Sequence, residues 1–358
     1  MRKTLVASLL VAASVAAAGC SSTPSNTPSG TPTGTPSADA SASQGMAGLD
    51  LQSHRGGRGE TTEESLRAFE KTLDLGVTTL EFDIVLTADG VPAVWHDPVV
   101  QAEKCSDTAP TTANDPKYPY VGKLMHELTW QQVQTLDCGK QLPKFPKAEV
   151  IKANKIIRLD DVFELTAKRG ADVYYNIETK LEAEHPEQSA TPQQFVDAIF
   201  TVVEKHQMTD RVLIQSFDWR SLPLVHARDP KVPLVLLWDE TTWVAGSKWT
   251  EPVSYDAVGG DIIKAAQQLN VSVLSPGYSV PYGQTAADAS FKLVADAAFM
   301  TKAHEAGMKV VPWTINDKAT MAAQMDAGAD GIITDYPTML RELMGERGMP
   351  LPPSFPAK

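Results

Sequence analysis

The chain has 358 residues, of which 42% are hydrophobic and 21% charged, and its formal net charge is −12. This composition is ordinary for a globular protein, and so acidic a chain lacks the basic surface that nucleic acid binding requires. We therefore expect no nucleic acid partner, whereas an excess of carboxylates is compatible with a site that holds a cation.

The first residues have the pattern of a secretory signal peptide. Arg2 and Lys3 precede an uncharged apolar run, which at about 15 residues is too short to span a bilayer as a helix. The run ends in Ala17-Ala18-Gly19-Cys20, which resembles a bacterial lipobox. We expect residues 1–19 to be removed and Cys20 to be lipidated, so that the exported protein is anchored at the extracytoplasmic face of the membrane. Plain secretion after cleavage nearby is the alternative.

A linker is expected between this anchor and the folded part of the chain. After Cys20, the residues up to 47 are almost wholly Ser, Thr, Pro, Gly and Ala. Such a segment cannot bury enough apolar surface to fold, so we predict that residues 20–47 form a disordered tether with a reach of roughly 30 Å. The folded domain is then expected at 48–345, followed by a C-terminal tail at 346–358.

From residue 49 the chain alternates short apolar runs with amphipathic stretches. The predicted strands are 49–53, 77–86, 91–95, 172–177, 211–215, 232–237, 271–274, 309–313 and 331–334. The predicted helices are 62–75, 158–169, 193–206, one from about 218, 262–269, 291–306 and 318–327. About eight strand–helix units favour an α/β fold of the closed TIM (β/α)8 barrel type. An open dinucleotide-binding sheet would carry GxGxxG after a strand, and this chain has none.

An insertion is expected after the second barrel strand, at about 98–155, where apolar periodicity is weak and Pro, Lys and Asp are frequent. It contains Cys105 and Cys138, the only cysteines after Cys20. In an exported protein two cysteines favour a disulfide, which would stabilise a loop of this length by about 3–4 kcal/mol. Two free buried thiols are the alternative, and no CxxC spacing indicates a metal site.

Polar side chains recur at the predicted strand ends, which is where the chemistry of such barrels lies. The first strand ends in Ser53-His54-Arg55-Gly56-Gly57, which offers an imidazole for proton exchange and a guanidinium for phosphate. Trp95-His96-Asp97 supplies a second imidazole, and later strands end in Gln215-Ser216-Phe217 and in Trp313-Thr314-Ile315-Asn316. Each motif alone could be ordinary, but their recurrence where a barrel would gather them indicates one site.

Carboxylates of the same strand ends predict a metal centre. Glu81 and Asp83 are two residues apart, so both side chains point to the inward face of their strand. Burying two charged carboxylates there costs free energy unless a cation binds between them. A hard divalent ion would remove that cost. Glu178 could complete a site of three carboxylates, and Lys180, on the same face as Glu178, would face phosphate. A solvated pair on an edge strand is the alternative, but the apolar neighbours indicate an internal strand.

In type and order these motifs resemble the glycerophosphodiester phosphodiesterase family over nearly all of residues 50–340. The resemblance begins with HRG at His54–Gly56, ExD at Glu81 and Asp83, and a second His at His96. It continues with ExK at Glu178 and Lys180, QSF at Gln215–Phe217, WTxN at Trp313–Asn316 and TD.P at Thr334–Pro337. The family's PENT-like helix start reads Thr62-Glu63-Glu64-Ser65 here, so Thr62 stands for Pro and Glu64 for Asn. This departure affects the helix entry and any contact from residue 64, and it leaves the metal site intact.

The resemblance implies a TIM barrel with an insertion after the second strand and one divalent ion, Ca²⁺ or Mg²⁺. It implies hydrolysis of glycerophosphodiesters to sn-glycerol 3-phosphate and an alcohol, with the glycerol hydroxyl able to attack first and water opening the cyclic phosphate. The implied roles are metal binding by Glu81, Asp83 and Glu178, acid–base catalysis by His54 and His96, phosphate binding by Arg55 and Lys180, and packing on the glycerol carbons by Trp313 and Phe217. Which histidine is the acid stays open, and barrel core is the alternative role of both aromatic residues.

Two other functions stay open. A sphingomyelinase D-like lipase would use a similar His/Glu/Asp/His set on the same barrel, although the spacing from His54 to Glu81 leaves room for the PENT-type helix start and so favours the glycerophosphodiesterase. A solute-binding lipoprotein without chemistry would need no paired imidazoles. The remaining histidines lie away from strand ends and receive no role: His126, His185, His206, His226 and His304.

Overall fold

A computed structural model describes residues 48–357 of the chain. The predicted signal peptide, the lipidation site Cys20 and the linker lie outside the described residues. Within the described part, no helix has the length and apolar character needed to cross a membrane.

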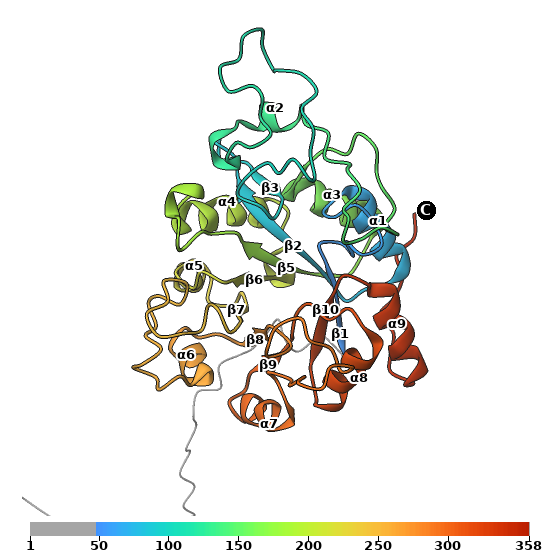
Figure 1. The fold of residues 1–358 in the computed structure, drawn as a ribbon, viewed down its shortest axis with the longest axis vertical. Coiled ribbons are helices and arrows are strands. Elements are labelled where there is room, and N and C mark those ends of the chain that lie inside the picture. Colours follow the sequence, from blue (N-terminus) through green and yellow to red (C-terminus); the bar gives the residue numbers. More distant parts are fainter. Residues whose placement is uncertain (1–47, 358) are drawn as a thin grey trace, which may run out of the picture. The chain divides into compact units, whose positions relative to one another are not determined.

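Eight parallel strands of residues 48–357 form a closed barrel (Figure 1). They are β1 (Asp50–His54), β2 (Thr79–Leu86), β5 (Tyr174–Thr179), β6 (Val212–Ser216), β7 (Leu234–Trp238), β8 (Val273–Pro276), β9 (Lys309–Val310) and β10 (Gly331–Thr334). Their order is β10-β1-β2-β5-β6-β7-β8-β9. Backbone hydrogen bonds from Asp330 N to Val310 O (3.0 Å) and from Ile333 N to Pro312 O (3.1 Å) join the two ends of this order. The predicted TIM barrel is confirmed.

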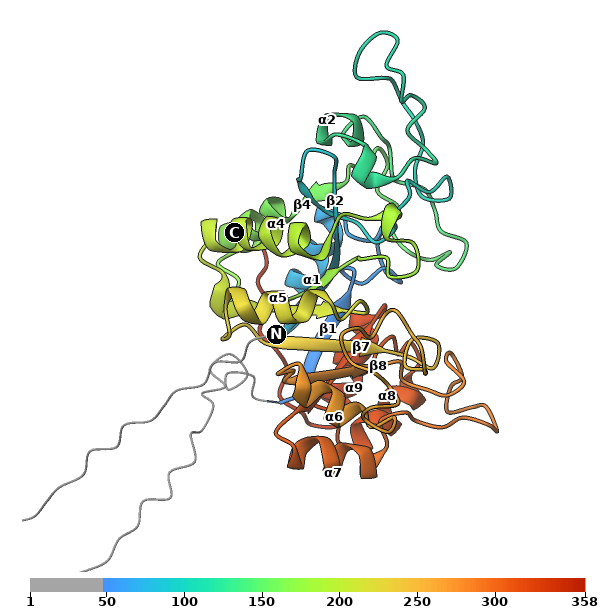
Figure 2. The ribbon, with the colours of Figure 1, turned by 90° about the vertical axis from the view of Figure 1, so that its left-hand side faces the viewer.

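Helices surround the barrel, as the two perpendicular views show (Figures 1 and 2). They are α1 (Leu66–Leu75), α3 (Leu159–Arg169), α4 (Pro192–Lys205), α5 (Ser221–Arg228), α6 (Ile262–Gln268), α7 (Ala297–Glu305), α8 (Lys318–Asp326) and α9 (Pro337–Glu346). Local sequence explains several helix starts. Thr191, Asp296 and Asp317 each accept a hydrogen bond from a backbone N–H of the first turn.

Two helix starts were predicted too early. α1 begins at Leu66 instead of residue 62, because Glu64 adopts a left-handed φ of 52° that a helix cannot contain, and Ser65 then caps the helix. α7 begins at Ala297 instead of residue 291, because the Asp296 side chain caps it. The residues before Asp296 instead form the loop that follows β8. The structure also adds α9 and the short elements α2 (Trp130–Val133) and β4 (Ile157–Arg158), which the sequence analysis missed.

The core has an outer and an inner layer. Leu80, Phe82 and Ile84 of β2 point outward and belong to the large apolar cluster between strands and helices. A smaller cluster fills the barrel itself, and its buried members are Leu213, Val235, Val273, Val311 and Ile333. The inner positions of β1, β2 and β5 instead carry polar side chains, which are described below.

The insertion has a small core of its own. β3 (Pro92–Val94) pairs antiparallel with β2 and with β4, and the long segment between β3 and β4 extends beyond one side of the barrel around α2 (Figures 1 and 2). Its buried cluster includes Trp95, Tyr120 and Cys105. Cys105 is bonded to Cys138 across 33 positions, so the predicted pair is a disulfide in the structure.

Candidate active site

Three acidic side chains meet at the carboxyl ends of β2 and β5. Glu81 and Asp83 follow one another on the inner face of β2, and the parallel register places Asp83 opposite Glu178 of β5. One carboxylate oxygen of each residue lies within 4.8 Å of the others. All three residues are buried. The structure therefore brings together the three predicted metal ligands.

The turn after β1 orients Glu81. Arg55 has a left-handed φ of 51°, and its backbone N–H donates to Oε2 of Glu81 at 2.9 Å. Gly56 follows with a φ of 74°, and a Cβ there would lie 2.9 Å from Cβ of Ala68, so the turn needs glycine at this position. From the opposite side Gln215 Nε2 donates to Oε1 of Glu81 at 2.6 Å. Each oxygen of this carboxylate thus has a fixed donor.

The electrostatics of the cluster favour a bound cation. Burial raises the pKa of Glu178 to about 7 and raises the pKa of Glu81 well above its ordinary value, with the neighbouring Asp83 adding to the shift at Glu81. Burial acts in the same direction on Asp83, but the Arg55 guanidinium together with Lys180 and the two imidazoles outweighs it and holds the pKa of Asp83 below its usual range. Ionising all three groups together is costly without a counter-charge. Three converging buried carboxylates are a suitable donor set for a hard divalent ion.

The two predicted phosphate-binding cations border the same cluster. Nε of Arg55 lies 3.0 Å from Oδ2 of Asp83, and Nζ of Lys180 lies 2.7 Å from Oε1 of Glu178. Both residues also line a cavity of about 120 Å³ that opens at the carboxyl end of the barrel. Each is therefore paired with a carboxylate of the cluster and still borders the space where a ligand would lie.

His54 is held by a carboxylate that the sequence analysis did not assign. Its Nδ1 lies 2.5 Å from Oδ1 of Asp335, which directly follows β10 and is fully buried. Asp335 also accepts hydrogen bonds from Arg58 Nε and Asn316 Nδ2, each at 2.7 Å. Asp335 belongs to the TD.P motif, so the motif together with the strand-end rule could have indicated this role.

His96 has a similar arrangement. Its Nδ1 lies 2.8 Å from Oδ1 of the adjacent Asp97. Because a carboxylate accepts, Nδ1 carries the proton in both histidines and Nε2 is left for proton exchange. Burial lowers the pKa of His54 to about 4 and lowers the pKa of His96 well below its usual value. Both imidazoles are therefore neutral near pH 7 before a substrate binds.

Aromatic side chains form one wall of the cavity. Trp313 stacks edge-on against Phe217 at 5.2 Å between ring centroids and lies 5.0 Å from Tyr282. The Trp313 indole donates to the carbonyl of Ser275 at 2.9 Å, which fixes the ring. Trp313 and Phe217 line the cavity, and Tyr282, which comes from a loop with no strand-end signal and was missed, lines it as well.

A second group of acidic and imidazole side chains lies outside this site in the described part of the chain. Asp160 and Glu164 of α3 and His206 at the end of α4 are near one another. Asp160 already accepts hydrogen bonds from Lys205 and from His206, and Glu164 is exposed to solvent. This group is a surface ion-pair cluster, and His206 receives no functional role.

Comparison with known proteins gives a consistent result. The chain is 25% identical over 296 residues to a glycerophosphodiester phosphodiesterase of Caldanaerobacter subterraneus, covering 83% of this chain and 98% of the relative. It is also 24% identical to a glycerophosphodiester phosphodiesterase of Bacillus subtilis, over 81% of this chain and 85% of that relative. Its fold is similar to that of an Oleispira antarctica phosphodiesterase solved with the product sn-glycerol-3-phosphate. The TM-score is 0.59 and the sequence identity 18%, over 83% of this chain and 97% of the other.

A family comparison covers the barrel from the end of β1 to the start of α9. Residues 54–339 match the description "Glycerophosphoryl diester phosphodiesterase family", a stretch that begins at His54 and ends within α9. It includes both histidines, all three clustered carboxylates and the complete insertion. The chain therefore belongs to the glycerophosphoryl diester phosphodiesterase family.

Proposed function

We propose that the protein hydrolyses glycerophosphodiesters to sn-glycerol 3-phosphate and an alcohol. The observation that carries this proposal is a cluster of three buried carboxylates, two of which line one cavity together with both imidazoles. Each imidazole is held through Nδ1 by its own aspartate, so both present Nε2. Relatives named glycerophosphodiester phosphodiesterase, which align with 83% and 81% of this chain, support the same reaction.

A single divalent ion, Ca²⁺ or Mg²⁺, is proposed at Glu81, Asp83 and Glu178. When bound, such an ion stabilises the negative charge that develops on the phosphoryl oxygens. Asp83 and Glu178 lie side by side in the sheet register, and the fixed donors on Glu81 keep its carboxylate in place. Arg55 would add a fixed positive charge on the phosphate side of the cluster, as would Lys180.

Proton transfers are assigned to the two histidines. One of His54 and His96 takes the proton of the attacking hydroxyl on Nε2, and the other donates a proton to the leaving alkoxide. The attacking group is either the glycerol hydroxyl of the substrate, which gives a cyclic phosphate that water then opens, or water directly. Because both pKa values lie below the usual value in the free protein, the acid must gain its proton when the anionic substrate binds. Each transfer is typically worth about 10²–10⁴-fold in rate.

The aromatic wall would receive the glycerol carbons. Trp313 is fixed by its hydrogen bond to Ser275, and Phe217 packs against it within the cavity that also contains both histidines. Flat apolar rings suit the carbon face of a small polyol, whose hydroxyls stay free for hydrogen bonds.

The test is hydrolysis of glycerophosphocholine by the purified protein, with release of sn-glycerol 3-phosphate as the readout. EDTA should abolish release, and added Ca²⁺ or Mg²⁺ should restore it. The Glu178→Gln variant should need a higher ion concentration, while Glu164→Gln, on the outer surface of α3, is the matched control. Full activity in EDTA would contradict the metal proposal. A cyclic lipid phosphate as the product from a lysolipid would favour the sphingomyelinase D-like reaction, and retained ligand without turnover would favour a solute-binding protein.

Export and anchoring are proposed on the sequence pattern of residues 1–47. The partition into a signal peptide (1–19), a lipidated tether (20–47), a barrel (48–345) and a tail (346–358) is part of this proposal. Fractionation of the source cells should place the protein with membranes, and Cys20→Ser should release it into the soluble exported fraction. Retention of the Cys20→Ser protein in the membrane fraction would contradict the anchor.

A further inference from the structure

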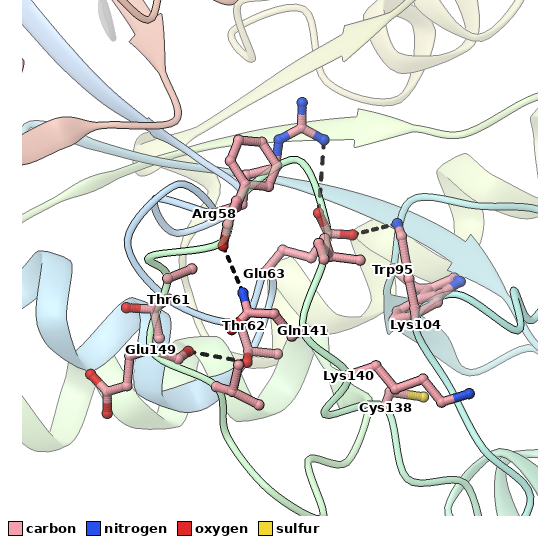
Figure 3. A pocket seen from close by; sticks show the side chains of 14 residues that line it. Arg58, Thr61, Thr62, Glu63, Trp95, Lys104, Cys138, Lys140, Gln141 and Glu149 are labelled. Atoms are coloured by element: carbon pink, nitrogen blue, oxygen red, sulfur yellow. Dashed lines mark hydrogen bonds and ion pairs between the residues drawn. The ribbon is translucent and has the colours of Figure 1, made fainter.

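Lys104 of the insertion contacts two buried carboxylates at once. Its Nζ lies 2.5 Å from Oδ2 of Asp97 and also forms a close ion pair with Oε1 of Glu63. Figure 3 shows Glu63 between Lys104 and Arg58, with its carboxylate directed at both. The two carboxylates come from different parts of the chain, since Glu63 precedes α1 and Asp97 follows β3.

Each of these carboxylates also contacts a residue of the active site. The second oxygen of Asp97 accepts from Nδ1 of His96 at 2.8 Å. The second oxygen of Glu63 lies 3.5 Å from a guanidinium nitrogen of Arg55. Lys104 is therefore one contact away from His96 on one side and from Arg55 on the other, although it is not among the residues that line the site cavity.

The contacts of Lys104 are made away from bulk solvent. Its side chain is 13% exposed, and those of Asp97 and Glu63 are 10% and 4% exposed. Burial alone would lower the pKa of Lys104, but the two carboxylates outweigh it, so the pKa is raised and the ammonium stays charged. Removing this charge would leave Asp97 its contact with His96 and Glu63 its longer contacts with two guanidinium groups, and each carboxylate would turn toward those partners.

We infer that Lys104 is a positioning residue for catalysis, holding His96 through Asp97 and Arg55 through Glu63. This inference rests on the proposed function. The backbone supports it, because Lys104 and Cys105 both donate to the carbonyl of Gln101, and Cys105 is bonded to Cys138. The insertion thus contributes to the site through one lysine whose backbone is fixed on either side.

Kinetics of three variants test the inference. Lys104→Met keeps the length of the side chain and removes its charge, and we expect kcat to fall about 10- to 100-fold, the range typical of residues that orient catalytic groups. Lys104→Arg, which keeps the charge and the donors, should retain kcat within about fivefold of wild type. The matched control is Lys140→Met, since Lys140 belongs to the same insertion and its ammonium donates to the carbonyl of Ala102. Its backbone N–H donates to the carbonyl of Lys104, a contact that the methionine variant keeps. It should behave as wild type.

A double-mutant cycle separates positioning from general loss of stability. If Lys104 acts on His96 through Asp97, then the loss in the Asp97→Asn/Lys104→Met double variant should be smaller than the product of the two single losses, because only the route through Glu63 to Arg55 is independent of Asp97. Additive losses, or a Lys104→Met enzyme within twofold of wild type, would overturn the inference. An arginine variant as slow as the methionine variant would overturn it as well.

A readout without turnover keeps the inference testable if the proposed function fails. In ¹⁵N-labelled wild-type protein, the ring nitrogens of His96 should report a single tautomer with the proton on Nδ1, assigned by its absence in His96→Asn. In Lys104→Met the same signals should show a mixture of tautomers, whereas Lys140→Met should leave them unchanged. An unaltered His96 tautomer in Lys104→Met would overturn the inference even if no substrate is hydrolysed.

Discussion

The two histidines of the site are supported by different regions of the molecule. His54 and its partner Asp335 both lie on the barrel, at the ends of the neighbouring strands β1 and β10. His96 and Asp97 instead follow the short strand β3, and Lys104 of the insertion contacts Asp97. The His54 side chain is 11% exposed and that of His96 is 30% exposed.

This difference shows how one arrangement can be built in two ways. On the barrel side, the spacing of two hydrogen-bonded strands sets the distance between imidazole and carboxylate, and Asn316 and Arg58 hold the carboxylate from further sides. On the insertion side, the imidazole and the carboxylate belong to adjacent residues, and the insertion that contacts Asp97 has its own disulfide and small core. Sequence change in the insertion can therefore alter the support of His96 while leaving the direct contact between His54 and Asp335 in place.

Removing either imidazole should have the largest effect. We expect His54→Ala and His96→Ala each to lower kcat by about 10²–10⁴-fold, because each variant loses one proton transfer. Both variants should fold, as measured by circular dichroism, with His226→Ala in α5 as the matched control. Turnover close to wild type in His54→Ala would contradict the catalytic scheme.

Loss of the disulfide should affect the insertion half alone. For Cys105→Ala with Cys138→Ala we expect the free energy of unfolding of the insertion to fall by about 3–4 kcal/mol, because a loop of this length is no longer closed in the unfolded chain. Hydrogen exchange should become faster around α2 and stay unchanged in β1 and β10. Equal loss of protection in the barrel strands would show that the two halves are not independent.

The two aspartates should differ in their effect on rate. Asp335→Asn should lower kcat about 100-fold, since a fully buried acceptor that serves His54, Arg58 and Asn316 would lose its charge. Asp97→Asn should lower kcat about 10-fold, because the more exposed His96 can exchange partners with water. The measurement is kcat on glycerophosphocholine at saturating ion concentration, and a larger loss in Asp97→Asn would reverse the proposed ranking.

The smallest effect concerns a carboxylate at the opposite end of the barrel. Asp50 accepts from Gln52 and Thr79, and burial raises its pKa to about 6. An acid whose pKa is raised on folding makes the folded state less stable as pH rises from its unfolded value, near 4, to about 6. Relative to Asp50→Asn, wild type should therefore lose about 2 kcal/mol of unfolding free energy between pH 4.5 and pH 7.5.

Urea unfolding of both proteins at the two pH values measures this difference, and other titrating groups cancel in the comparison. A difference that stays constant with pH would show that Asp50 ionises as readily in the folded protein as in the unfolded chain.

Local patterns in the sequence were enough to predict the fold class and the main site residues. Glu81 and Asp83 face the same way because side chains alternate along a strand, and this holds wherever the strand lies. Parallel strands of a barrel end on one face, so polar groups at successive strand ends must converge. These two rules place His54 and Glu178 in one site with Glu81 and Asp83. His96 follows β3, which runs antiparallel to β2, so the rule for parallel strands does not account for its position.

Other features depended on how distant segments pack. His54 and Asp335 are 281 positions apart and meet only because β10 closes the barrel beside β1. Lys104 lies in a segment without periodicity, where nothing local indicates the direction of a side chain, so its contacts with Asp97 and Glu63 came from tertiary folding. Periodic backbone geometry can be read from neighbouring residues, whereas ion pairs between loops depend on the whole arrangement of the chain.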